Sequence, residues 1–84
     1  MTIQFSNTAL KALKKIDKNT ARKIIEYSHE LEKLKDPRAR GKGLKSNLAG
    51  LWRYRIGDYR MICEIRDEVL TIMVLKIGHR RDVY

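Results

Sequence analysis

One stretch restricts the possible folds more than any other: residues 51–65, LWRYRIGDYRMICEI. Apolar and polar residues alternate on both sides of the pair Gly57-Asp58. Strict alternation is typical of a half-buried strand, and a glycine-containing pair between two such runs predicts a tight β-hairpin. A two-residue turn also predicts the register, in which Arg55 lies opposite Arg60 and Trp52 lies opposite Cys63.

This register divides the hairpin into an apolar face and a basic face, because successive side chains of a strand point to opposite sides. Like charges directly opposite each other destabilise a strand pair, whereas a guanidinium group matches the oxygens of a phosphate. Three converging arginines therefore favour an anionic ligand; a solvated basic strand face is the alternative. The apolar face contains Trp52, Tyr54, Ile56, Tyr59, Met61, Cys63 and Ile65, and the basic face contains Arg53, Arg55 and Arg60, with Ile62 and Glu64 beyond them.

Length and charge limit the classes of function. The 84 residues predict a single small domain, residues 1–84, and the formal net charge of +9 favours a polyanionic partner. The longest apolar run, near Leu70–Leu75, is too short to span a bilayer, and the first residues do not resemble a signal peptide, so we expect a cytoplasmic protein with no membrane partner.

The side chains that commonly bind metals are sparse. Cys63 is the single cysteine, so an internal disulfide is excluded, and its place on the apolar face predicts a buried structural thiol. His29 and His79 are far apart in the sequence, with no second cysteine. We therefore predict neither a metal site nor a cofactor.

The rest of the chain predicts one strand and a pair of helices before the hairpin in the sequence, and one more strand after it. Thr2–Phe5 alternates and predicts a short first strand, and Ser6 or Asn7 can cap the helix that follows. A second helix is expected from about Thr20 to Lys35, where Asp36-Pro37 ends it. Val69–Ile77 is rich in β-formers and predicts the last strand. The expected fold is α+β, with an antiparallel helical hairpin on one face of a mainly antiparallel four-stranded sheet and the basic residues on the other.

Two features leave alternatives open. The segment 38–50 shows neither helical nor strand periodicity. An irregular segment of this length is often functional. The alternative is a solvated basic loop with no function. From Arg38 to Arg60 there are seven basic residues and one acid, Asp58. The loop before the last strand can take two lengths: one would place Lys76 toward the core, and the longer one, which we prefer, would place Lys76 beside the arginines.

Two motifs resemble a known family. Residues 51–60, LWRYRIGDYR, and residues 77–84, IGHRRDVY, are similar to the RelE-type toxins of bacterial and archaeal toxin–antitoxin modules. The resemblance covers essentially the whole chain. It implies ribosome-dependent cleavage of messenger RNA in the decoding site, by attack of a ribose 2′-hydroxyl on the adjacent phosphate without a metal, and it implies a cognate antitoxin as partner besides the ribosome and the messenger RNA.

The resemblance also implies roles for individual residues. Arg53 and Arg55 match the basic pair of one strand, and Arg60 matches a phosphate-stabilising arginine on the next strand. Arg80 matches the arginine after the last strand, and Tyr84 matches a carboxy-terminal tyrosine that stacks on or orients a base. Because arginine does not lose its proton, His79 is the preferred group for proton transfer. The remaining candidates for RNA binding are Lys42, Lys45, Lys76 and Arg81.

Alternative functions remain at this stage. Related ParE-type toxins share the fold and poison DNA gyrase, and a degenerate toxin would act only as the partner of an antitoxin. A general RNA-binding protein would use Trp52 and Tyr54 as a stacking platform. The register argues against that last possibility, since both rings are expected to face the core.

Overall fold

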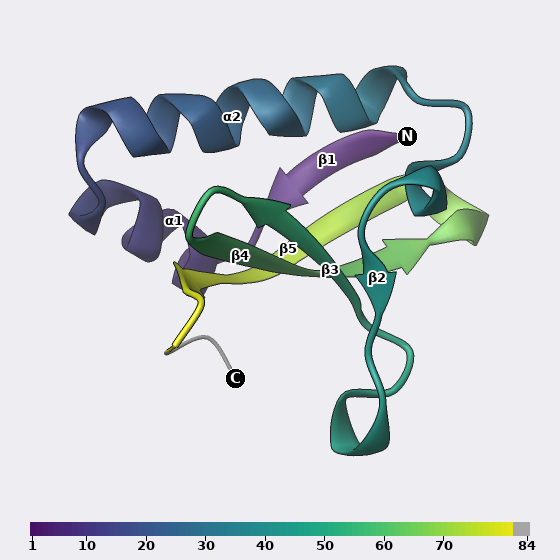
Figure 1. Cartoon of the computed structure of the whole chain (residues 1–84). Helices are drawn as coiled ribbons and strands as arrows, with labels where there is room; N and C mark the ends of the chain where they lie inside the picture. The colour runs from purple at the N-terminus through teal and green to yellow at the C-terminus, as the bar shows by residue number, and fades with distance from the viewer. Residues whose placement is uncertain (82–84) are drawn as a thin grey trace.

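Two helices cover one face of a mixed five-stranded sheet in the computed structural model, which describes residues 1–81 (Figure 1). The strand order is β1-β5-β4-β3-β2; β1 pairs with β5 in parallel, and the other neighbours are antiparallel. The elements are β1 (Thr2–Phe5), α1 (Asn7–Lys15), α2 (Lys18–Lys33), β2 (Lys42–Gly43), β3 (Trp52–Ile56), β4 (Tyr59–Arg66) and β5 (Thr71–His79).

The predicted α+β class and the helices on one face are confirmed, but the predicted number of four strands is wrong. The additional strand is β2, which has only two residues and pairs with the start of β3. It lies in the segment expected to be irregular, together with two short 3₁₀ turns, Pro37–Ala39 and Ser46–Leu48. A strand of two residues shows no alternation, so periodicity does not reveal it.

Helix capping follows the sequence closely. The Ser6 hydroxyl accepts a hydrogen bond from the Ala9 amide at 3.1 Å, which confirms Ser6 as the cap of α1. The second helix starts at Lys18, earlier than predicted, because the Asp17 carboxylate accepts from the Thr20 amide at 3.0 Å and acts as its cap. It ends at Lys33, before Asp36-Pro37.

The core lies between the helices and the apolar face of the hairpin. The predicted β3–β4 register is confirmed, with Arg55 opposite Arg60 and Trp52 opposite Cys63. Tyr54 is fully buried, and its hydroxyl donates to the Pro37 carbonyl at 2.8 Å, so this ring cannot serve as a stacking platform for RNA. The buried core comprises Ala9, Ile24, Leu31, Tyr54, Ile56, Met61, Cys63, Ile72, Val74 and Ile77.

Cys63 is a buried thiol, as expected from its place on the apolar face. Burial raises the pKa of this thiol to about 12, because the interior disfavours the thiolate. The thiol therefore stays protonated at neutral pH, which excludes Cys63 as a nucleophile under these conditions.

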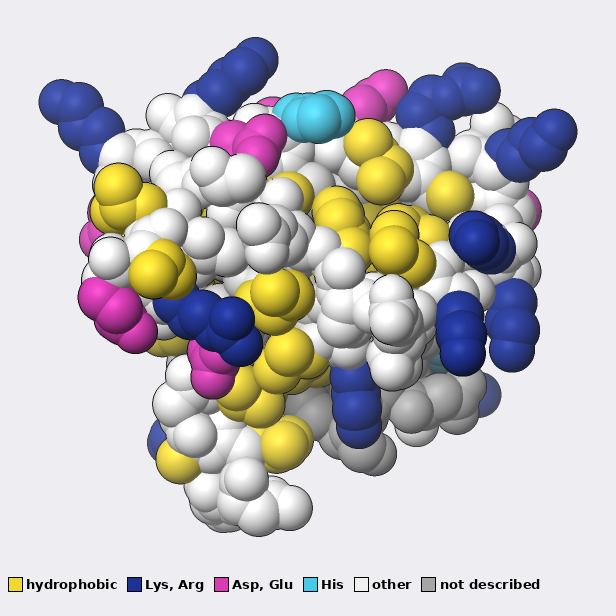
Figure 2. Space-filling model, turned by 180° about the vertical axis from the view of Figure 1, so that it is seen from behind, with side chains coloured by type: hydrophobic (Ala, Val, Ile, Leu, Met, Phe, Trp, Pro, Cys, Tyr) yellow, Lys and Arg dark blue, Asp and Glu magenta, His cyan; other side chains and the backbone are white. Residues whose placement is uncertain are grey.

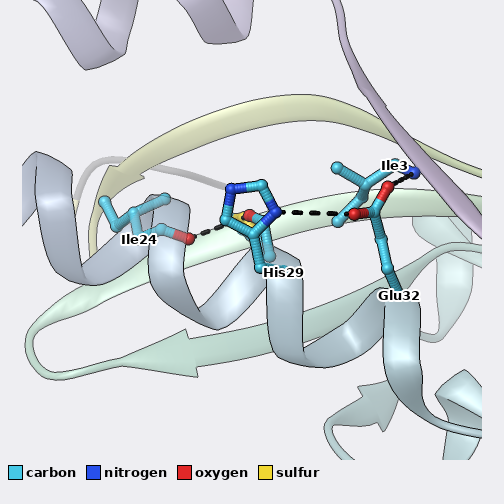
Figure 3. A network of polar contacts seen from close by, with 6 residues as sticks. Ile3, Ile24, His29 and Glu32 are labelled. Carbon is cyan, nitrogen blue, oxygen red and sulfur yellow. Dashed lines mark hydrogen bonds and ion pairs between the residues drawn. The ribbon is translucent and has the colours of Figure 1, made fainter.

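The outer edge of β1 is covered by a carboxylate from α2. The Ile3 amide donates to Glu32 Oε2 at 2.9 Å, and His29 Nδ1 lies 3.5 Å from the other oxygen, Glu32 Oε1 (Figure 3). The amides of Thr2 and Ser6 instead donate to carbonyls on the β5 side. Glu32 thus satisfies an edge amide that would otherwise be available to another chain.

Acidification is expected to release this edge contact. The hydrogen bond from the Ile3 amide, with a smaller effect of His29, lowers the pKa of Glu32 below its usual value of 4.5. A carboxylate with a lowered pKa stabilises the fold above its unfolded-state pKa, and the stabilisation is lost as the pH falls through the folded-state pKa. Hydrogen exchange measured between pH 7 and pH ~3 should show the protection factor of the Ile3 amide falling in that acid range.

The matched variants are Glu32→Gln and Glu26→Gln, since both residues belong to α2 and Glu26 is exposed. Glu32→Gln should lower the protection of the Ile3 amide already at pH 7, whereas Glu26→Gln should behave as the unmodified chain. Equal protection of Ile3 in both variants would contradict the proposed role of Glu32.

Candidate nucleic-acid interface

A basic face lies on the side of the sheet opposite the helices; we use this name for Lys42, Arg53, Arg55, Arg60 and Lys76. Two rows of paired residues build it. In one row Lys42 pairs with Arg53, Arg53 with Ile62, and Ile62 with Lys76. In the other row Arg55 pairs with Arg60, and Arg60 with Gly78. Paired residues of neighbouring strands project to the same face, so the three arginines converge as expected.

The place of Lys76 resolves the ambiguity about the last strand. Four residues, Asp67–Leu70, separate β4 from β5, and the register shifts by one residue at Ile62/Cys63. This bulge directs Ile77 into the core and brings Lys76 opposite Ile62. Lys76 therefore lies on the basic face, as the preferred alternative predicts, but the connection is longer than predicted and the bulge sets the final register.

The three arginines differ in their surroundings. Arg55 is exposed, whereas Arg53 is half-buried beside Ile62, of which only 3% is exposed. The Arg60 guanidinium folds back onto the hairpin turn, where Nη1 donates to the carbonyls of Tyr59 at 3.2 Å and Gly57 at 3.3 Å. Gly78, opposite Arg60, has no side chain, so it leaves space beside this guanidinium.

A cavity of about 410 Å³ opens at the β3 edge of the basic face, where β2 is too short to cover β3. Gly41 makes this close approach possible: its φ is +77°, and a Cβ atom there would lie 2.4 Å from the Arg53 carbonyl oxygen. The Trp52 indole donates to the Arg40 carbonyl at 2.7 Å and holds the same segment. The cavity is lined by Tyr27, Gly41, Lys42, Arg53 and Arg55.

Tyr27 is a lining residue that the sequence does not single out. Its ring packs at 5.9 Å from the ring of Tyr54, and the Arg40 guanidinium lies 5.5 Å from its centroid. Burial raises the pKa of the Tyr27 phenol, although Arg40 opposes the shift, so the hydroxyl is neutral at physiological pH. A neutral aromatic ring beside arginines suits contact with a nucleobase.

Not every basic residue of segment 38–60 reaches the basic face. Arg38 forms a bidentate pair with Asp67, with N–O distances of 3.0 and 2.8 Å, and Arg40 pairs with Glu30 at 3.0 Å. Lys45 lies in the loop between β2 and β3, which projects away from the sheet (Figure 1). The structure therefore brings Lys42 to the arginines but not Lys45.

The residues from the end of β5 onward fall into three groups. His79 pairs with Tyr59, which belongs to the apolar face, and the two rings meet edge to face at 5.8 Å. His79, the preferred group for proton transfer, therefore does not face the arginines, because residues 76 and 79 project from opposite faces of one strand. Arg80 and Arg81 are exposed, and the Arg80 amide donates to the Asp58 carbonyl at 2.8 Å. Tyr84 lies outside the described residues.

Within residues 1–81, no three His, Cys, Asp or Glu side chains are grouped so that they could hold a metal ion. Neither helix among those residues has the length and apolar character needed to cross a membrane.

Comparisons with known proteins agree on one superfamily. A family model described as ParE toxin of type II toxin-antitoxin system, parDE, matches residues 3–84. Toxin RelG of Mycobacterium tuberculosis is 32% identical over 83 residues, which are 99% of this chain and 94% of RelG.

Solved structures match in three dimensions as well. The toxin–antitoxin complex RelBE2 from Mycobacterium tuberculosis contains a chain with a TM-score of 0.85 and 32% identity, covering 94% of this chain and 96% of that chain. A chain of the archaeal RelE–RelB complex from Pyrococcus horikoshii has a TM-score of 0.75 and 27% identity, covering 96% of both chains. This chain therefore belongs to the RelE/ParE superfamily of toxins from toxin–antitoxin modules.

Proposed function

We propose that this toxin is an endoribonuclease that cleaves messenger RNA in the decoding site of the ribosome. The observation that carries the proposal is the convergence of Arg53, Arg55 and Arg60 on one face, which Lys42 and Lys76 extend. Placing Arg55 directly opposite Arg60 costs stability in the free protein, and a phosphate bound between them would relieve the repulsion.

The proposed reaction uses the 2′-hydroxyl of RNA as the nucleophile. Its oxygen loses its proton and forms a bond to the adjacent phosphorus, while the bond from phosphorus to the 5′-oxygen breaks and that oxygen takes up a proton. The products carry a 2′,3′-cyclic phosphate and a 5′-hydroxyl. Negative charge develops on the phosphorane oxygens, and guanidinium groups fixed beside them stabilise it without a metal or another cofactor. We assign this role to Arg53, Arg55, Arg60 and Arg80; Arg81, Lys42, Lys76 and Lys45 would bind the flanking RNA, and Tyr84 would stack on a base.

Proton transfer is the weakest part of the catalytic set. The two paired rows of the basic face contain only Arg, Lys, Ile and Gly among the described residues, so these rows hold no imidazole or carboxylate group. His79 projects to the other face of β5. We therefore propose that the toxin chiefly stabilises charge and that the ribosome orients the 2′-hydroxyl for in-line attack, which would account for ribosome dependence.

An antitoxin is the second expected partner. The related toxins in the RelBE2 and RelE–RelB structures are bound to antitoxins, as the names of those complexes state. A net charge of +9 on so small a domain favours a partner that is acidic where it crosses the basic face. Cytoplasmic action follows from the same proposal, since ribosomes and the partner are encountered there.

A ParE-like action on DNA gyrase is the second candidate function. One observation favours it: the family model that matches this chain is that of ParE toxins. Such a toxin would trap DNA breaks and leave ribosome-bound messenger RNA intact.

Controlled expression followed by primer extension distinguishes the two candidates. We expect growth arrest, relieved by a co-expressed antitoxin, together with cuts in messenger RNA at a fixed position within codons. His79→Ala should leave the position of these cuts within codons unchanged, because His79 lies off the basic face. DNA breaks without such cuts would contradict the ribonuclease and support the gyrase poison.

A further inference from the structure

A second cavity, of about 420 Å³, lies at the opposite edge of the same sheet. It forms where β5 continues past the end of β1: the last β1 pair is Phe5 with Val74, and Ser6 then donates to Val74 O and Leu75 O as the chain turns into α1. The cavity is lined by Thr8, Lys15, Ile16, Tyr59, Lys76, Ile77, Gly78 and His79.

Backbone groups of β5 are directed toward this cavity. The Arg80 amide donates to the Asp58 carbonyl on the β4 side. Since backbone groups alternate between the two edges of an antiparallel strand, the amides and carbonyls of Ile77 and His79 point to the other edge, where the cavity lies. Such groups can donate to and accept from the edge of a planar polar ligand.

The side chains of the cavity are cationic and aromatic. Lys15, in the last turn of α1, and Lys76 are exposed, and no carboxylate is among the lining residues within 1–81. Lysine and arginine side chains gather on the α1 side of the molecule, seen from behind in Figure 2. The planes of the Tyr59 and His79 rings meet at 81°, so the two rings pack edge to face. Ammonium groups beside aromatic rings suit a phosphate joined to a base.

The cavity is continuous with the basic face through β5. Lys76 belongs both to the cavity lining and to the row that contains Arg53 and Lys42. Two strand spacings separate Arg53 from Lys76, about 10 Å, a separation that adjoining nucleotides of an extended strand can cover. The two cavities therefore lie at the two ends of one basic row.

We propose that the cavity beside α1 is a binding subsite for one nucleotide of the RNA strand next to the scissile phosphate. Lys15 and Lys76 hold its phosphate, and the base lies against Tyr59 and His79. The inference rests on the proposed ribonuclease function and extends it, because it gives His79 a role in binding in place of proton transfer.

The test is an NMR titration of the isolated full chain with adenosine and cytidine 5′-monophosphates. Inorganic phosphate and the uncharged nucleosides are the comparison ligands. The expected result is a set of amide shifts at Lys15, Tyr59 and residues 77–79 with the monophosphates, and much smaller shifts with either comparison ligand. Equal shifts with inorganic phosphate, or shifts confined to Arg53, Arg55 and Arg60, would overturn the assignment of a nucleotide subsite.

Lys15→Ala and Lys14→Ala form a matched pair, since both lysines are exposed in the last turn of α1 and only Lys15 lines the cavity. Loss of one charge-assisted contact should weaken monophosphate binding about tenfold in Lys15→Ala, against about twofold or less in Lys14→Ala. Equal weakening in both variants would overturn the subsite. The titration contains no ribosome, so its result does not depend on cleavage. If the expression experiment gave no cuts in messenger RNA, the proposed reaction would be wrong, but nucleotide binding in this cavity would still stand.

Discussion

Replacement of Arg60 by alanine is expected to abolish toxicity by lowering the rate of messenger RNA cleavage about 10²- to 10³-fold. The reason is the loss of a guanidinium that stabilises charge developing on the phosphate. The measurement is single-turnover cleavage of messenger RNA on purified ribosomes. Since the side chain lies on the surface of β4 and bonds only to carbonyls of the hairpin turn among the described residues, the fold should persist.

Two variants control for charge and for geometry. Arg22→Ala removes the same charge from an exposed position on α2 and should leave the cleavage rate within about twofold of the unmodified chain, because distant surface charges are largely screened. Arg60→Lys keeps the charge but loses the bidentate fork, and it should recover only part of the rate. Full activity of Arg60→Ala, with the same thermal midpoint, would contradict a role for Arg60 at the phosphate.

Gly41→Ala is expected to lower stability more than an alanine at Gly43, Gly50 or Gly57. The new methyl group would lie 2.4 Å from the Arg53 carbonyl oxygen and 2.8 Å from Trp52 Nε1, and neither group can move without disturbing β3. Together with the positive φ of +77°, this overlap should lower the free energy of unfolding by about 3 kcal/mol or more. Urea denaturation followed by circular dichroism measures the change.

Gly50→Ala isolates the backbone contribution. Gly50 also has a positive φ, +91°, but no atom lies within 4 Å of its added Cβ. The free energy of unfolding of Gly50→Ala should fall by only about 1 kcal/mol, which is the cost of a non-glycine residue in a left-handed conformation. Equal stability of Gly41→Ala and Gly50→Ala would contradict the proposed steric overlap between residue 41 and β3.

The hairpin shows how far local sequence determines this fold. A two-residue turn leaves one register for the flanking strands, so the apolar pattern alone predicts which side chains meet the helices and which arginines converge. The β4–β5 connection is different. Leu70 takes a left-handed φ of 50°, and a bulge shifts the register at Ile62/Cys63. The alternation of apolar and polar residues predicts neither feature.

That single bulge determines on which face of the sheet two of the candidate site residues lie. It brings Lys76 to the basic face, as preferred, and the same shift places His79 with Tyr59 on the other side. The alternation of side chains could have shown that Lys76 and His79, three residues apart, cannot share a face. Tyr27 and Gly41 could not be predicted in the same way, because their place beside Arg53 depends on contacts between α2, segment 38–41 and β3.

The most direct test of the proposed reaction is cleavage of a messenger RNA with one 2′-deoxynucleotide placed immediately before the cut. Purified ribosomes programmed with this messenger are mixed with the toxin, and the fragments are compared with those of the all-ribose messenger. The proposed mechanism predicts cleavage of the all-ribose strand, leaving a 2′,3′-cyclic phosphate and a 5′-hydroxyl, and no cleavage at the deoxy position. Cleavage of both messengers at equal rates would show that the 2′-hydroxyl is not the nucleophile and would contradict the proposed reaction.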